Sequence, residues 1–153
     1  MLVAAVVLLV FFRDTGHHFK SRISGKPPVQ LRSQKPVPAS PRDRAAAEAT
    51  LDRFVRTAVI RQNADEAWDL ATPQMRAGSS RSAWKRGDLP VVPYLDEFRD
   101  SGTTLKYSYS GILGYDVLVL PKSPSGRQVV YACELHRVGA RWLVDWCYPR
   151  TTL

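Results

Sequence analysis

The sequence predicts an α+β domain in which N-terminal helices pack on one face of a curved antiparallel sheet. Two patterns along the chain support this class. Apolar side chains recur at helical spacing from about residue 41, and short helical segments follow up to about residue 99. From Thr103 onward, apolar and polar side chains alternate with a period of two, as in half-buried strands. The chain of 153 residues is long enough for one such domain and an appendage.

The first helix of the domain is predicted over residues 41–62. Ser40 offers a capping hydroxyl, Pro41 suits the first helical position, and Asp43 places a carboxylate in the first turn. A second, short helix is predicted to restart at Asn63, three residues before Glu66. Three more short helical segments are predicted, at Thr72-Pro73, over Ser80–Arg86 before Gly87, and at about 94–99.

The second half of the domain is predicted to form a run of antiparallel strands. Alternation begins with Leu105, Tyr107 and Tyr109, and Val117–Leu120 is apolar on both faces, as in a central strand. A hairpin loop over Pro121–Arg127 contains Pro, Ser and Gly. The last two strands are predicted over Val129–Val138 and Arg141–Tyr148, with a type II′ turn at Gly139-Ala140.

That two-residue turn predicts the register of the last hairpin, because it pairs Val138 with Arg141. Continued without interruption, the register places Glu134 opposite Asp145. A slip of one residue would set Leu135 across from Asp145, so the first register is preferred. The face that then carries Tyr131, Cys133 and Leu135 opposite Tyr148, Trp146 and Val144 is expected to point inward. Cys133 and Cys147 fall on opposite faces, and we expect no disulfide between them.

Residues 1–12 carry no polar side chain. As a helix they span about 18 Å, less than the roughly 30 Å of a bilayer's hydrocarbon core. Three interpretations compete: the apolar region of a signal peptide, a buried core helix, or a membrane anchor whose first turns lie upstream. We favour the anchor, because no small-residue cleavage site follows and no polar residue creates an amphipathic face.

The formal net charge of +8 comes mostly from the residues that follow the apolar segment. Residues 13–44 hold eight basic and two acidic side chains, whereas residues 45–153 hold 14 basic and 12 acidic ones. We interpret 13–40 as a basic, Pro-rich linker and 41–150 as the folded domain. A nucleic-acid-binding protein needs its basic patch on the domain, so we expect no nucleic-acid partner. A basic tether beside a membrane accounts for the charge.

Several motifs together resemble the nuclear-transport-factor-2-like superfamily. They are Phe54-Val55 with Ala58-Val59, the run Ala67–Pro73, Ser82, Trp84 and Gly87 before Pro90–Tyr94, and Gly139 with Arg141–Asp145. The resemblance covers residues of about 41–149 and implies a cone-shaped, cystatin-like α+β fold. It is strongest to the membrane-tethered bacterial members, which have an anchor, a linker and one such domain, mostly without assigned activity. In that group the domain lies outside the cytoplasmic membrane, whereas the positive-inside rule taken literally places it in the cytoplasm.

The acid–base candidates are Asp116, Glu134, His136 and Asp145. Two carboxylates held across a strand pair repel, which raises one pKa toward a useful range. In enzymes of the resembled fold such groups point into the cone. Here the aromatic face is expected inward, so the acidic pair is expected to point outward as a solvated or partner-facing patch. For Asp116 both orientations remain open.

Six aromatic side chains could line a cavity for an apolar ligand, although core packing is the favoured interpretation. They are Trp84, Tyr94, Tyr107, Tyr131, Trp142 and Trp146. We expect neither a cofactor nor a metal. Three histidines offer little for a metal centre, and the His17-His18 pair lies in the linker with no carboxylate cluster nearby.

These observations lead to a functional hypothesis of a single-pass, membrane-tethered, non-catalytic domain outside the membrane. Residues 1–12 would anchor it in the cell membrane, and it would bind a protein partner, a second copy of itself or a small apolar ligand. The alternative is a small isomerase, hydrolase or cyclase-like enzyme that uses the cone cavity. A third interpretation is a structural subunit of an envelope complex.

Overall fold

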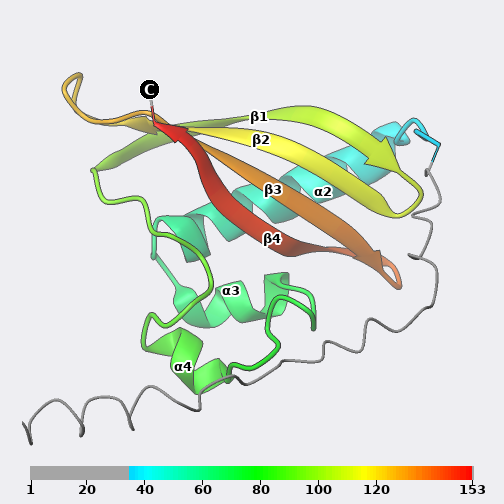
Figure 1. Cartoon of the computed structure of the whole chain (residues 1–153), viewed down its shortest axis with the longest axis horizontal. Coiled ribbons are helices and arrows are strands. Elements are labelled where there is room, and N and C mark those ends of the chain that lie inside the picture. Colours follow the sequence, from blue (N-terminus) through cyan, green and yellow to red (C-terminus); the bar gives the residue numbers. More distant parts are fainter. Residues whose placement is uncertain (1–34, 153) are drawn as a thin grey trace, which may run out of the picture. The chain divides into compact units, whose positions relative to one another are not determined.

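A computed structural model describes residues 35–152, with side chains up to residue 150. It has α+β architecture: helices come first and a four-stranded antiparallel sheet follows (Figure 1). The predicted anchor over 1–12 and the linker up to residue 34 lie outside the described residues. Among the helices of the described part, none has both the length and the apolar character to cross a membrane.

The longest helix, α2 (Pro41–Phe54), begins as predicted. The Ser40 hydroxyl accepts a hydrogen bond from the Asp43 backbone N–H at 3.0 Å, and Pro41 occupies the first turn. The helix continues into a π-helical turn, η1 (Val55–Val59), and ends three residues before the predicted end. Arg61 adopts a left-handed conformation (φ 63°), and its guanidinium donates to the Val91 carbonyl at 2.7 Å. This reversal ends the helix.

Of the shorter helices, two form where the sequence predicts them. Asn63 caps α3 (Ala64–Leu70) and Ser80 caps α4 (Arg81–Lys85), each through its side-chain oxygen. At Thr72 the hydroxyl accepts from the Met75 N–H at 3.1 Å, but only turns follow, without a helix. The prediction of a helix at about 94–99 is wrong, because no helix forms there. The Asp96 carboxylate and the Glu97 carbonyl instead accept backbone N–H groups from the 122–127 loop.

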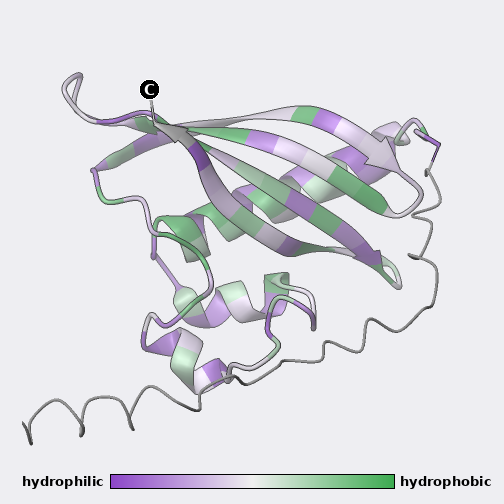
Figure 2. Ribbon diagram, in the orientation of Figure 1, coloured by the Kyte–Doolittle hydropathy of each residue, from purple (hydrophilic) through white to green (hydrophobic). Residues whose placement is uncertain are grey.

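The sheet is a meander of β1 (Phe98–Tyr109), β2 (Ile112–Pro121), β3 (Val129–Val138) and β4 (Arg141–Thr152). Figure 1 shows α2 running against one face of this sheet. Hydrophobic and hydrophilic residues alternate along the strands (Figure 2), because successive side chains point to opposite faces. The inner face, turned toward α2, buries the alternate residues Leu113, Tyr115, Val117 and Val119 of β2.

The β3–β4 hairpin begins in the predicted register and then departs from it. Val138 pairs with Arg141 and Leu135 with Val144, but Glu134 pairs with Trp146, so Asp145 is an extra residue in a β-bulge. The segment before the bulge is tied to a distant part of the chain. The Thr72 N–H donates to the Val144 carbonyl at 2.8 Å, and the Thr72 hydroxyl donates to Asp145 Oδ1 at 2.6 Å.

The bulge corrects two expectations. Beyond it the register has slipped by one residue, so Cys133 lies directly opposite Cys147, with Cα atoms 4.1 Å apart, and the two form a disulfide. The expectation of separate faces was therefore wrong. For the same reason Trp146 lies beside Glu134 rather than on the face that buries Tyr131. The pairing near the turn is unchanged by the slip, because Leu135 still lies opposite its apolar partner Val144.

Candidate functional site

The face of the sheet turned away from α2, here called the open face, carries most of the candidate residues. Tyr107, Gly114, Glu134 and Trp146 pair in sequence across the four strands, so their side-chain positions share this face. A groove of about 290 Å³ runs along it. Tyr107 lines one side, and the Trp146 and Tyr148 rings, stacked with centroids 5.0 Å apart, line the other.

Asp116 lies at the rim of this groove and points away from the helices. It accepts from Arg150 Nη1 at 3.2 Å and lies 3.6 Å from the Lys106 ammonium group. The side chain is 21% exposed. Of the two orientations that the sequence left open, the structure shows the outward one, where two cations compensate the carboxylate.

Glu134, His136 and Asp145 lie close together on the open face. His136 Nε2 lies 2.7 Å from Glu134 Oε1 and 3.9 Å from Asp145 Oδ2. Hydroxyl groups from two other segments hold the remaining carboxylate oxygens. Tyr107 donates to Glu134 Oε2 at 2.5 Å, and Thr72 donates to Asp145 Oδ1. Partial burial and then the bond to Glu134 raise the pKa of Tyr107, so this hydroxyl stays a donor.

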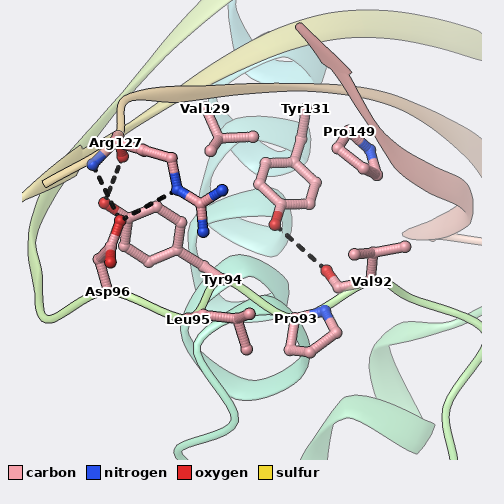
Figure 3. A pocket seen from close by; sticks show the side chains of 9 residues that line it. All are labelled: Val92, Pro93, Tyr94, Leu95, Asp96, Arg127, Val129, Tyr131 and Pro149. Atoms are coloured by element: carbon pink, nitrogen blue, oxygen red, sulfur yellow. Dashed lines mark hydrogen bonds and ion pairs between the residues drawn. The ribbon is translucent and has the colours of Figure 1, made fainter. Parts of the chain in front are cut away.

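A second concavity, here called the end pocket, lies where the 92–96 loop meets the ends of β3 and β4 (Figure 3). Its volume is about 210 Å³. It is lined by Val92, Pro93, Tyr94, Leu95, Asp96, Arg127, Val129, Tyr131 and Pro149. Most of these side chains are apolar or aromatic, so the pocket suits an apolar group.

The polar groups of the end pocket are already engaged with protein atoms. The Tyr94 hydroxyl donates to the Arg127 carbonyl at 2.7 Å, and the Tyr131 hydroxyl donates to the Val92 carbonyl at 3.2 Å. Asp96 accepts from the Arg127 N–H at 2.9 Å (Figure 3). Burial raises the pKa of Tyr131 to about 12, so its hydroxyl stays protonated at neutral pH.

The six aromatic candidates therefore do not surround one cavity. Tyr94 and Tyr131 line the end pocket, and Tyr107 and Trp146 line the groove of the open face. Trp84 is fully buried and packs edge-on against Trp68 with ring centroids 5.3 Å apart. Trp142 is also buried, and its indole N–H donates to Asp43 at 3.4 Å. These last two are core residues.

Sequence reasoning missed most of the lining of the end pocket. Val92 and Arg127 fell in segments expected to connect elements, and Leu95 fell in the helix predicted at about 94–99, because periodicity marks elements and not the loops that pack together. The high exposure of Leu95 beside Pro93 indicates a binding surface, but exposure can be judged only once the fold is known. No family model matches the chain, and neither a curated protein nor a solved structure is significantly similar to it.

Proposed function

We propose that the chain is a membrane-tethered, non-catalytic binding domain outside the cytoplasmic membrane, which recognises a protein partner through the end pocket. On this proposal the domain has the cone-shaped nuclear-transport-factor-2-like fold, and residues 1–12 hold it in the cell membrane. The helices-first order and the antiparallel meander are compatible with that fold. The alternative occupant of the pocket is a small apolar ligand, which native mass spectrometry distinguishes from a protein partner.

The observation that carries the proposal is the exposed apolar rim of the end pocket. Val92 is 54% exposed and Leu95 is 79% exposed. They are two of only five large hydrophobic residues that are exposed in the described part of the chain, and both line this one pocket. Covering them would contribute up to about 1.5–3 kcal/mol for each side chain. An exposed apolar patch around a preformed pocket is typical of an interaction site.

The size of the end pocket favours a side chain of a protein over a free ligand. A volume of about 210 Å³ lies below the roughly 300–1,000 Å³ of most small-molecule sites. It matches one large apolar side chain that inserts as an anchor, while the surrounding rim excludes water. Arg127 and Asp96 at the edge of the pocket pair with each other and would form a polar rim.

The pairing of polar groups in the end pocket supports a binding role rather than a catalytic one. Both tyrosine hydroxyls donate to backbone carbonyls, and Asp96 is held by Arg127. None of these groups is arranged as a general base for a bound substrate. The enzyme alternative draws no support from the placement of its candidates. Asp116 and the Glu134 cluster lie on the open face, opposite the face of the sheet that packs against α2.

The disulfide supports a location outside the cytoplasm. Disulfides persist in oxidising compartments and are rare where thiols are kept reduced. The Cys133–Cys147 bond lies in the core, with both residues nearly fully buried. This agrees with an extracytoplasmic domain on a basic, Pro-rich tether.

Photo-crosslinking of the full chain in its native membrane tests the proposal. A photoreactive phenylalanine analogue at position 95 is expected to give one discrete protein adduct. Val92→Asp should abolish that adduct, whereas Val138→Asp, at another exposed valine at the end of β3, should leave it. An adduct of twice the chain's mass would identify a second copy as the partner. No adduct, or one that Val92→Asp leaves unchanged, would refute a protein partner at this pocket.

Native mass spectrometry of the detergent-solubilised chain tests the other occupant. A reproducible extra mass of a small molecule that Val92→Asp removes would assign the pocket to an apolar ligand instead. Binding of either kind that survives Val92→Asp would exclude the end pocket as the recognition site.

A further inference from the structure

The cluster on the open face has a geometry that the end pocket and the proposed binding role do not use. Glu134, His136 and Asp145 each offer one ligand atom, and these atoms lie within 4.8 Å of one another. Ligands around a tetrahedral zinc ion at bond lengths of about 2.1 Å are about 3.4 Å apart. The separations of 2.7 Å and 3.9 Å from His136 Nε2 bracket that value. The three atoms therefore lie at about the spacing that the ligands of one ion require.

The charge of the cluster is an independent reason to place a cation there. Glu134 and Asp145 have side chains 18% and 15% exposed, the lowest values among the ion-paired carboxylates of the described residues. Other partly buried carboxylates such as Asp116 and Asp43 have arginine partners. Within residues 35–150, no arginine or lysine forms an ion pair with Glu134 or Asp145, and they share one imidazole. Two poorly solvated negative charges therefore face at most one positive charge.

Two hydroxyl groups each bind the outer oxygen of one carboxylate, which leaves the other oxygen facing the centre of the cluster. Tyr107, from β1, donates to Glu134 Oε2, and Thr72, from the segment after α3, donates to Asp145 Oδ1. The other two oxygens, Glu134 Oε1 and Asp145 Oδ2, are those that face His136 Nε2. Hydrogen bonds of this kind orient the ligands of metal sites. The bulge at Asp145 brings the third ligand onto the same face.

We propose that Glu134, His136 and Asp145 bind one divalent transition-metal ion of the zinc class on the open face of the sheet. One imidazole nitrogen and two carboxylate oxygens suit Zn²⁺, Co²⁺ and Ni²⁺ better than Mg²⁺ or Ca²⁺, which take mainly oxygen ligands. Three protein ligands leave at least one coordination position for water or for a group of a partner. The sequence expectation of no metal rested on the small number of histidines and on the place of His17-His18 in the linker, whereas this site needs only one histidine, His136.

Calorimetric titration of the full chain with Zn²⁺ in detergent tests the site, after dialysis against a chelator and then metal-free buffer. The background carries His17→Gln and His18→Gln, because that adjacent pair could bind zinc by itself. We expect saturable binding of one ion per chain. His136→Gln, Glu134→Gln and Asp145→Asn should each weaken it at least tenfold. Tyr107→Phe, which frees one ligand, should weaken it by about 10-fold. Asp116→Asn is the matched control and should change the affinity less than twofold.

A second readout is the visible absorption of Co²⁺ in the same position, which reports coordination geometry. The band should appear at one equivalent and disappear in His136→Gln. Thermal melting by circular dichroism checks folding, and if His136→Gln does not fold, the near-isosteric Glu134→Gln and Asp145→Asn decide. The proposal would be overturned by the absence of saturable binding at roughly 0.1 mM Zn²⁺, or by ligand variants that bind as tightly as the unsubstituted background. A loss of affinity with Asp116→Asn as large as with His136→Gln would also overturn it.

Discussion

Gly114→Ala is a sensitive test of how the open face is packed. A methyl group at Gly114 would lie 2.1 Å from Cζ of the Tyr107 ring and 2.3–2.5 Å from its two Cε atoms. The backbone itself would accept alanine, because Gly114 has no positive φ. The substitution must therefore displace the Tyr107 ring, and with it the hydroxyl that donates to Glu134.

The expected cost can be estimated from three contributions. Overpacking typically costs 1–3 kcal/mol, about 2 here because the ring can swing outward at an edge strand. Loss of a hydrogen bond to a partly exposed carboxylate adds about 1 kcal/mol. Reduced freedom of the unfolded chain returns about 0.4–1 kcal/mol. Gly114→Ala should therefore lower the free energy of unfolding by about 2 kcal/mol.

Urea unfolding of the full chain, followed by circular dichroism, measures this change, and a double-mutant cycle identifies its cause. In a Tyr107→Ala background the ring is absent, so Gly114→Ala should become neutral or stabilising by up to about 1 kcal/mol. Gly102→Ala, in the same sheet with no atom within 4 Å of the new methyl group, is the control. It should change the stability by less than about 1 kcal/mol. The same loss in both backgrounds would refute the reasoning.

Three further predictions concern buried groups. Replacing Cys133 and Cys147 by alanine opens a loop with a sequence separation of 14 and should lower the unfolding free energy by about 3 kcal/mol. Resistance to alkylation in denaturant, before reduction, checks the bond itself, and full alkylation there would contradict it. Tyr115→Phe should leave the free energy of unfolding unchanged or raise it, because its buried hydroxyl has no partner among the described residues. Tyr131→Phe should lower it by about 1 kcal/mol, because its hydroxyl donates to the Val92 carbonyl. Denaturation curves that rank the two variants the other way would contradict this. Burial raises the pKa of both tyrosines to about 12, so above pH 10 the unfolded chain binds fewer protons than the folded one. The free energy of unfolding should then fall by about 2 kcal/mol per tyrosine between pH 10 and pH 12. A flat pH profile, measured by urea unfolding at each pH, would exclude this.

Local features of the fold were predictable because local interactions cause them. Ser40, Asn63 and Ser80 each cap a helix through bonds that span three residues, so the sequence marks these starts. The β3–β4 turn likewise depends on Gly139, which adopts a positive φ of 61°. The helix expected at 94–99 failed because Asp96 and Glu97 bond to a loop about 25–30 residues away, which no local pattern reports.

The candidate sites show the same division. Alternation along β3 was enough to place Glu134 and His136 on one face, two residues apart. It was not enough to identify their surroundings. Tyr107 comes from another strand, and Thr72 lies 73 residues before Asp145. Of the end pocket only Tyr94 and Tyr131 were among the candidates, since most of the remaining lining comes from two connecting segments.

The sequence alone determined the order of helices and strands, their main caps and the start of the last hairpin. Where that hairpin slips depends on tertiary contacts, and the slip decides which residues pair farther along β3 and β4. Thr72 binds both Val144 and Asp145, and the extra residue there pairs Cys133 with Cys147 and turns Trp146 to the open face. The alternation of apolar and polar residues along a strand is visible in its own sequence. The position of a bulge depends instead on which distant residue forms hydrogen bonds with the strand's polar groups there.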